Sequence, residues 1–177
     1  MGVTSDIYPE FMNIWNSHHS EINTIYDVEL MINEFREIGL NLPDDYCFND
    51  EFVKRFTPNE SITKPINKAI EYGISVGLLT NMYQRMFKKI SDANLLPRIN
   101  FYPIIDSSLL GVAKPDIKIY EIALKEISYK PQNVLFVDNS IPNIKTAQLL
   151  GWQTYLYNPR NPIKSSNELL DIINISR

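Results

Sequence analysis

The segment Val134-Leu135-Phe136-Val137-Asp138-Asn139 places four apolar residues directly before a carboxylate and an amide. Apolar residues at every position, rather than at alternate ones, are typical of a strand covered on both faces of a parallel sheet. A carboxylate so close to a core is costly unless it is capped, paired or bound to a metal. Asp138 could also cap the helix expected from Ile141, a role that Asn139 or Ser140 could fill equally well.

On either side of this strand, the second half of the chain alternates strand-like and helix-like segments. Further strands are expected at 74–79, 103–106 and 153–157, and helices at 62–72, 83–93, 115–127, 141–150 and after Ser165. This alternation predicts an α/β fold with a Rossmann-like parallel sheet.

The first part of the chain has a different pattern. Residues 9–57 show apolar residues at three- and four-residue spacings, which indicates helices. The aromatic residues there are expected to form a core between these helices, although some could line a substrate entrance: Phe11, Trp15, Phe48 and Phe52. We therefore expect a small α-helical cap subdomain at 9–57 and a core made of 1–8 and 58–177.

Two more polar motifs stand where strands end or helices begin. Thr80-Asn81 follows the apolar run Gly77-Leu78-Leu79, and Lys114 comes just before Pro115. Ligands of open parallel sheets bind at the carboxyl ends of the strands. A hydroxyl, an ammonium and a carboxylate gathered there suit a phosphoryl group and a divalent cation. Thr80-Asn81 could instead cap the next helix, and Lys114 could be a solvated surface lysine.

Composition and charge argue against several classes of protein. The 177 residues carry a net charge of −4 without a basic run, which argues against nucleic acid as a partner. The longest apolar runs are too short to span a membrane. Cys47 is alone, the N-terminus lacks a signal-peptide pattern, and a cytoplasmic location is expected. His18 and His19 would not share a helix face, so both are expected to be exposed at a helix end.

In order, Gly77-Leu78-Leu79-Thr80-Asn81, Gly111-Val112-Ala113-Lys114-Pro115 and Val134–Ser140 resemble the second, third and fourth motifs of the haloacid dehalogenase superfamily. The resemblance implies a Rossmann-like core with a small α-helical cap, Mg²⁺ as cofactor, and hydrolysis of a small phosphorylated metabolite through an aspartyl intermediate. Dehalogenase chemistry stays open.

The resemblance also assigns roles to individual residues. Thr80, with Asn81, would bind the transferring group, and Lys114 would steady the nucleophile and the substrate. Asp138, with Asn139, would bind the metal. From its place in the first turn of the following helix, Asn143 could orient this loop.

The family's first motif, a strand that ends in the nucleophilic aspartate, has no counterpart here. The chain opens Met1-Gly2-Val3-Thr4-Ser5-Asp6, and Gly2-Val3 resembles the tail of that motif. Asp6 has no apolar strand before it to place it at the sheet edge. We therefore expect a truncated hydrolase that is inactive by itself. The alternative is a non-catalytic or split module that binds a ligand or is completed by another chain.

In the family's sheet, the missing strand lies between the strands that end at Thr80 and Asp138. Buried strand edges need partners. We expect these two strands to close directly on each other or to exchange strands with a second copy in a homo-oligomer. Insertion of Gly2–Tyr8 ranks lower, because this segment is short and carries Asp6 in its middle.

Overall fold

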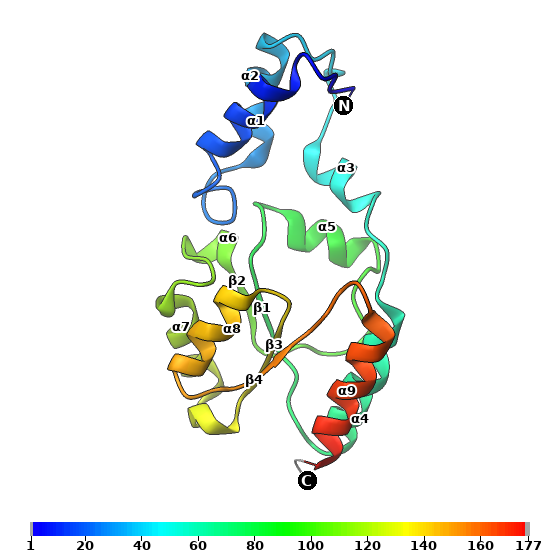
Figure 1. The fold of residues 1–177 in the computed structure, drawn as a ribbon, viewed down its shortest axis with the longest axis vertical. Coiled ribbons are helices and arrows are strands. Elements are labelled where there is room, and N and C mark those ends of the chain that lie inside the picture. The colour runs from blue at the N-terminus through cyan, green and yellow to red at the C-terminus, as the bar shows by residue number, and fades with distance from the viewer. Residues whose placement is uncertain (1, 176–177) are drawn as a thin grey trace. The chain divides into compact units, whose positions relative to one another are not determined.

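The computed structural model describes residues 2–175, and the chain divides into two compact units (Figure 1). The helical unit comprises Met1–Thr57, Asn81–Leu96 and Asp106–Ala113. The strand unit comprises Pro58–Thr80, Pro97–Ile105 and Lys114–Arg177. The boundary after Thr57 coincides with the expected end of the cap, but residues 2–8, 81–96 and 106–113 group with the helices. The roles of cap and core stay a proposal.

The helical unit is built around aromatic and aliphatic side chains. Its elements are α1 (Tyr8–Ser17), η1 (Val28–Leu30), α2 (Met31–Glu37), α3 (Phe48–Val53), α5 (Met86–Asp92) and α6 (Ser107–Leu110). Phe35 and Phe48 are buried, and the ring of Phe11 stacks on that of Phe35 at 4.6 Å between centroids. Trp15 and Phe52 pack against the same core. The aromatic core expected from the sequence is confirmed.

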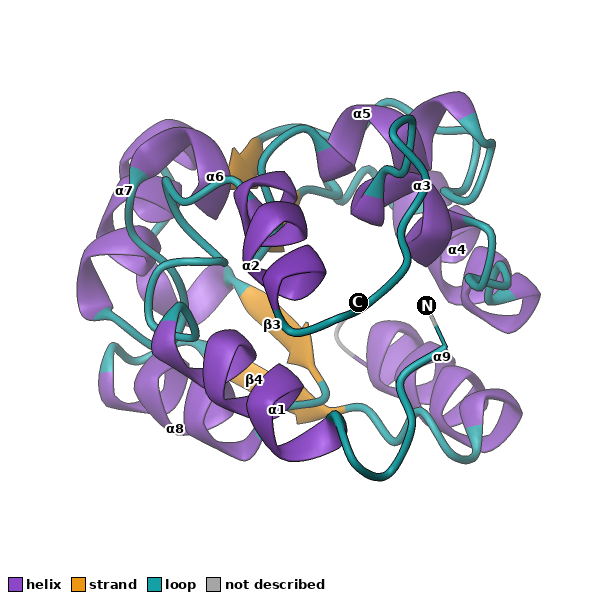
Figure 2. Ribbon diagram, turned by 90° about the horizontal axis from the view of Figure 1, so that it is seen from above, coloured by secondary structure: helices purple, strands orange, loops and turns teal. Residues whose placement is uncertain are grey.

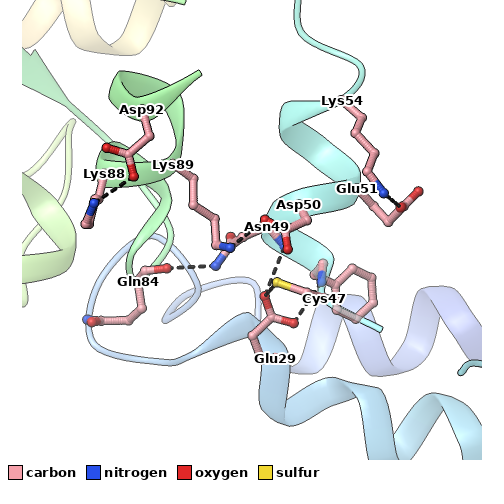
Figure 3. A network of polar contacts seen from close by, with 11 residues as sticks. Glu29, Cys47, Asn49, Asp50, Glu51, Lys54, Gln84, Lys88, Lys89 and Asp92 are labelled. Atoms are coloured by element: carbon pink, nitrogen blue, oxygen red, sulfur yellow. Dashed lines mark hydrogen bonds and ion pairs between the residues drawn. The ribbon is translucent and has the colours of Figure 1, made fainter. Parts of the chain in front are cut away.

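Polar contacts hold the N-terminal end of α3 (Figure 3). The carboxylate of Glu29 accepts hydrogen bonds from the backbone N–H groups of Phe48 (2.8 Å) and Asn49 (3.0 Å) and from the thiol of Cys47. These N–H groups have no partner inside a helix, so an anion there satisfies them. Asn49 Nδ2 donates to Gln84 O at 2.9 Å, which ties α3 to the segment 81–96 of the same unit.

The two histidines, His18 and His19, differ in how exposed their side chains are. His19 is exposed, as expected. His18 is half-buried: its ring stacks on Tyr26 and its Nε2 lies 2.9 Å from Glu34 Oε1. The prediction of an exposed His18 is therefore wrong, because a carboxylate from the next helix and an aromatic ring cover it.

The strand unit contains the elements that alternate in the sequence. They are η2 (Glu60–Ile62), α4 (Thr63–Glu71), β1 (Leu78–Thr80), β2 (Ile104–Asp106, its last residue in the helical unit), α7 (Ile117–Ile127), η3 (Pro131–Asn133), β3 (Leu135–Asp138), α8 (Ile141–Leu149), β4 (Gln153–Leu156) and α9 (Pro162–Ile175). Helices α7 and α8 lie on one side of β3 and β4, and α4 and α9 lie on the other (Figure 2).

Both faces of β3 are covered, as its uniform apolar sequence predicts. Phe136 packs edge-on against the rings of Tyr120 and Trp152 on one face. Leu135 and Val137 pack on the other face against the buried side chains of α4 and α9, which are Ala69, Leu169 and Ile173. The α/β class with a Rossmann-like arrangement is thereby confirmed.

The strands pair in two separate sheets. β3 pairs with β4 in parallel, with Leu135 opposite Gln153 and Asp138 opposite Leu156, and β1 pairs with β2. Among residues 2–175, β1 and β3 do not pair, so the expected direct closure between them is wrong. The side chain of Lys114 lies between their carboxyl ends instead, bonded to both.

The segment 2–8 does not fill the place between β1 and β3 either. It forms no strand, and its Val3 and Ile7 pack against the core of the helical unit. Asp6 is exposed there. This agrees with the low rank that the sequence gives to insertion of this segment, because its apolar residues are too few to line a buried strand on both faces.

Gly77 permits the close approach of two backbones before β1. A Cβ atom at this position would lie 2.8 Å from both the carbonyl oxygen and the Cδ of Pro103. We expect Gly77→Ala to lower the free energy of unfolding by about 1–3 kcal/mol, because neither the backbone nor the proline ring can yield cheaply. Urea unfolding measures this. Glu121→Ala, at an exposed position of α7, is the control, and equal midpoints for the two variants would contradict the prediction.

None of the helices within residues 2–175 is both long and apolar enough to cross a bilayer. The cytoplasmic location stays a prediction.

Candidate active site

Lys114 connects the carboxyl ends of β1 and β3. Its Nζ donates to Asp138 Oδ2 and to the backbone oxygen of Leu79, each at 2.7 Å. The side chains of Lys114 and Asp138 are only 9% and 7% exposed. A lysine buried to this degree keeps its charge by pairing with an anion. The alternative of a solvated surface lysine is therefore excluded.

Asp138 is the last residue of β3 and is held from several directions. Its Oδ1 accepts hydrogen bonds from the backbone N–H of Ser140 (2.8 Å) and from Asn143 Nδ2 (3.1 Å). Helix α8 begins at Ile141 with Ser140 as its N-cap and without a side-chain cap, so Asp138 is not the cap of this helix. Its carboxylate is oriented toward Lys114 instead.

A buried tyrosine, Tyr120, forms a hydrogen bond with Asn143, the residue that donates to Asp138. Tyr120 Oη donates to the backbone oxygen of Asn143 at 3.0 Å, in the first turn of α8. Burial, and secondly the charge of Asp138, raise the pKa of Tyr120 far above its usual value. The phenol therefore stays a neutral donor at any physiological pH and continues to position Asn143.

Thr80 ends β1, directly after the carbonyl that Lys114 contacts. It is half-buried, and Asn81 opens the next segment of the helical unit. Helix α5 begins only at Met86, so Thr80-Asn81 does not cap it. The alternative role as a helix cap is thus excluded, and the hydroxyl of Thr80 stands at the carboxyl end of its strand.

Asn139 is exposed, and its side chain makes no hydrogen bond to the other residues in 2–175. The structure therefore brings together Lys114, Asp138, Asn143 and the end of β1, but it does not bring the Asn139 amide to Asp138. Two partners of this site could not be found from the sequence: the Leu79 carbonyl and the Ser140 N–H. They are backbone groups, which every residue type carries, so no sequence signal identifies them.

The side chains at this site provide few ligands for a magnesium ion. Within residues 2–175, no group of three or more His, Cys, Asp or Glu side chains gathers as a metal cage. Asp138 offers one carboxylate, three of whose acceptor positions are taken by Lys114, Ser140 and Asn143. Magnesium in phosphate sites is commonly held by one or two carboxylates together with water and phosphate oxygens. Asp138 therefore fits as one ligand among several.

The family model of the haloacid dehalogenase-like hydrolases matches residues 24–151, well over half of the chain. The chain belongs to this family. The superfamily membership that the sequence motifs predict is therefore confirmed, while the roles of the individual residues stay predictions.

Curated relatives of this haloacid dehalogenase-like chain are longer proteins. It is 30% identical over 118 residues to acyl-CoA dehydrogenase family member 10 of Mus musculus, covering 63% of this chain and 11% of the relative. It is 29% identical over 127 residues to bifunctional epoxide hydrolase 2 of Sus scrofa (67% and 22%). A sesquiterpene phosphatase of Aspergillus oryzae is 29% identical over 94 residues (53% and 47%). The chain thus spans less than half the length of each.

Solved structures of the family share the fold. A haloacid dehalogenase family enzyme of Bacteroides thetaiotaomicron superposes with a TM-score of 0.71 at 18% identity, covering 86% of this chain and 79% of that one. Another structure of that enzyme, in complex with magnesium and inorganic phosphate, gives 0.65 at 19% identity (78% and 72%). A predicted hydrolase of the family from Porphyromonas gingivalis gives 0.64 at 20% identity (93% and 88%).

Proposed function

We propose that this chain is part of a magnesium-dependent phosphatase that acts on a small phosphate ester through an aspartyl intermediate. The observation that carries the proposal is the buried ammonium of Lys114, bonded to Asp138 where β1 and β3 end. A buried positive charge beside a carboxylate, next to a strand-terminal hydroxyl, suits the binding of a phosphoryl group. The sequence similarity to a relative that is a phosphatase supports this choice of substrate class.

The nucleophilic aspartate would come from a segment outside residues 2–175. Asp138 cannot serve, because three hydrogen bonds hold its carboxylate and the charge of Lys114 neutralises it. Asp6 is exposed in the helical unit and is not positioned by a strand. The added carboxylate would lie beside Lys114, at the carboxyl edge between β1 and β3.

The proposed reaction has two steps. The added carboxylate attacks phosphorus, the bond between phosphorus and the ester oxygen breaks, and the leaving oxygen takes a proton from a water molecule to depart as the alcohol. Water then attacks the phosphorus of the acyl phosphate, which releases inorganic phosphate and restores the carboxylate. Thr80, with Asn81, would donate to phosphoryl oxygens, and Lys114 would offset the negative charge that builds up on the phosphoryl group. Asn143 and Ser140 would keep Asp138 in place.

Asp138 would be a ligand of the magnesium ion. When bound, the ion supplies positive charge that polarises the phosphoryl group. Asn139, which is exposed, would reach the ion only through water or after the loop rearranges.

A second candidate function is a non-catalytic or split module. Two observations favour it: β1 and β3 do not pair, and the segment 2–8 is packed in the helical unit. In that case, the site around Lys114 would bind a phosphorylated ligand without turning it over.

The test is turnover by an extended chain. Val-Ile-Val-Phe-Asp-Leu is placed ahead of Met1, and phosphate release is measured on a panel of small phosphate esters with and without magnesium. We expect release from this Asp-extended chain with magnesium, and none from the unextended chain, because a covalent step needs a nucleophile.

The matched control carries asparagine in place of the aspartate of the extension and is expected to release no phosphate. Equal turnover by the two extended chains would refute the aspartyl intermediate. Turnover by the unextended chain that Asp6→Ala abolishes would move the nucleophile to Asp6. Tight binding of phosphate without turnover by either form would favour the non-catalytic module.

A further inference from the structure

The ammonium of Lys114 lies over the ring of a buried aromatic residue. Its Nζ is 5.5 Å from the centroid of the Phe136 ring. Phe136 is 7% exposed, and the side chain of Lys114 is 9% exposed. An ammonium within about 6 Å of an aromatic face is attracted by the negative charge on that face, and burial strengthens this attraction. The contact therefore adds to the hydrogen bonds of Lys114 with Asp138 and Leu79.

Two other rings fix the orientation of the Phe136 ring. Tyr120 and Trp152 meet it at 73° and 78°, with centroids 5.5 Å and 5.9 Å away. Tyr120 and Trp152 also meet each other edge to face, at 5.6 Å. Such contacts set the positive edge of one ring against the negative face of another. All three residues are buried, and side chains in a close-packed interior keep one favoured orientation. The face that Phe136 presents to Lys114 is thus held in place.

The same aromatic residues reach the anion that pairs with Lys114. Tyr120 Oη donates to the backbone oxygen of Asn143, and Asn143 Nδ2 donates to Asp138 Oδ1. Asp138 Oδ2 accepts from Lys114 Nζ. These contacts form a closed network within the strand unit, whose members are Lys114, Asp138, Asn143, Tyr120 and Phe136. Phe136 contacts the ammonium and Tyr120 supports the carboxylate, so one set of packed rings holds both members of the ion pair.

The strand itself does not require an aromatic residue at position 136. Leu135 and Val137 cover the opposite face of β3 with aliphatic side chains. An aliphatic residue at position 136 would satisfy the strand in the same way, but it has no negative face. A polar acceptor there would compete for the three N–H donors that a lysine carries. An aromatic face attracts the charge and leaves these donors to the oxygen atoms around them.

We propose that Phe136 is a positioning residue for Lys114, whose ammonium the negative face of the ring holds between Asp138 and Leu79 O. Its use in turnover rests on the proposed phosphatase function, in which Lys114 offsets charge on the phosphoryl group. The contact between ring and ammonium does not depend on that function. Because the ring carries no formal charge, it repels an anionic phosphoryl group less than a second carboxylate would.

Fluorinated phenylalanines at position 136 test the electrostatic role of the ring. The series 4-fluoro-, 3,5-difluoro- and 3,4,5-trifluorophenylalanine removes negative charge from the ring face stepwise and changes its size little. We expect the folding equilibrium constant of the unextended chain, measured by urea unfolding, to fall stepwise, by about three- to tenfold with three fluorines. The same series is measured in the double variant Lys114→Met, Asp138→Leu, which lacks both charges. There we expect most of the fall to disappear, because ring packing remains but the ammonium does not.

Phe48 in the helical unit is the matched control for packing. It is buried like Phe136 and also meets two rings edge to face, those of Phe35 at 5.5 Å and Tyr46 at 5.3 Å. Within residues 2–175, no lysine or arginine lies over its ring. The series at Phe48 is expected to have the same effect with and without the two charges. Equal effects in the two backgrounds at position 136 would overturn the proposal, because packing alone would then explain the loss.

Turnover by the Asp-extended chain is the second readout. Three fluorines at position 136 are expected to lower kcat about threefold with little change in KM, because the charge of Lys114 matters most in the transition state. Three fluorines at Phe48 are expected to change neither. A charge-dependent effect on stability with an unchanged kcat would overturn the positioning role. Absence of turnover from every extended chain would refute the proposed function instead, and the stability series would still decide whether Phe136 holds the ammonium.

Discussion

Replacing Lys114 by alanine in the Asp-extended chain is expected to lower kcat by about 10²–10³, the usual cost of removing one preorganised charge from a transition state. The ammonium is buried and bonded to Asp138 and Leu79 O, so a water molecule cannot replace it without leaving the Asp138 carboxylate unpaired. The loss is expected mainly in kcat, because the charge on the phosphoryl group and the nucleophile changes most in the transition state.

The matched control is Lys118→Ala in the same extended chain. Lys118 lies four residues further along, in the first turn of α7, and it is exposed. We expect its kcat and KM to remain unchanged. A loss of equal size in both variants would show that the general charge of this segment, and not the buried ammonium, supports turnover.

Replacing Asp138 by leucine is expected to lower the free energy of unfolding by about 3–5 kcal/mol, because it leaves the buried ammonium of Lys114 without its anion. It also removes the acceptor of Ser140 N–H and Asn143 Nδ2 at the start of α8. Urea unfolding of the unextended chain, which needs no catalytic activity, measures the effect.

A double variant separates the ion pair from simple loss of packing. Lys114→Met together with Asp138→Leu is expected to regain a large part of the lost stability, because apolar residues can replace a buried pair but not one half of it. Glu71→Gln, which breaks the exposed pair with Lys68, is expected to leave the urea midpoint almost unchanged, because water screens an exposed pair. A double variant as unstable as Asp138→Leu alone would argue against the ion pair as the stabilising contact.

Local patterns in the sequence predict much of the strand unit. Four apolar residues before Asp138 predict β3, since a strand covered on both faces needs apolar side chains on both. Proline and aspartate before Ile117 predict the start of α7, where Asp116 accepts the N–H of Lys118. These features depend on residues that are neighbours in the sequence, so the local pattern is sufficient to predict them.

Elsewhere, contacts from distant residues override the local pattern. The helix expected from residue 83 begins at Met86, because Arg85 adopts a left-handed backbone with φ of 65°. Arg85 pairs with Asp27, and Gln84 Nε2 donates to Thr24 O and Ser108 O. Partners so far away in the chain leave no periodic signal near residue 85.

By itself, the sequence determined the α/β class, the order of strands and helices, and the presence of a hydroxyl and a carboxylate at strand ends and of an ammonium before a helix. These follow from short-range periodicity and from the residues that end each apolar run. Only the tertiary structure decided that Lys114 is buried between Leu79 and Asp138, because burial and ion pairing join residues 24 and 35 positions apart. It also decided that, within residues 2–175, β1 and β3 do not pair with each other, since strand pairing depends on which backbone edges meet in space and not on the side chains that each strand carries.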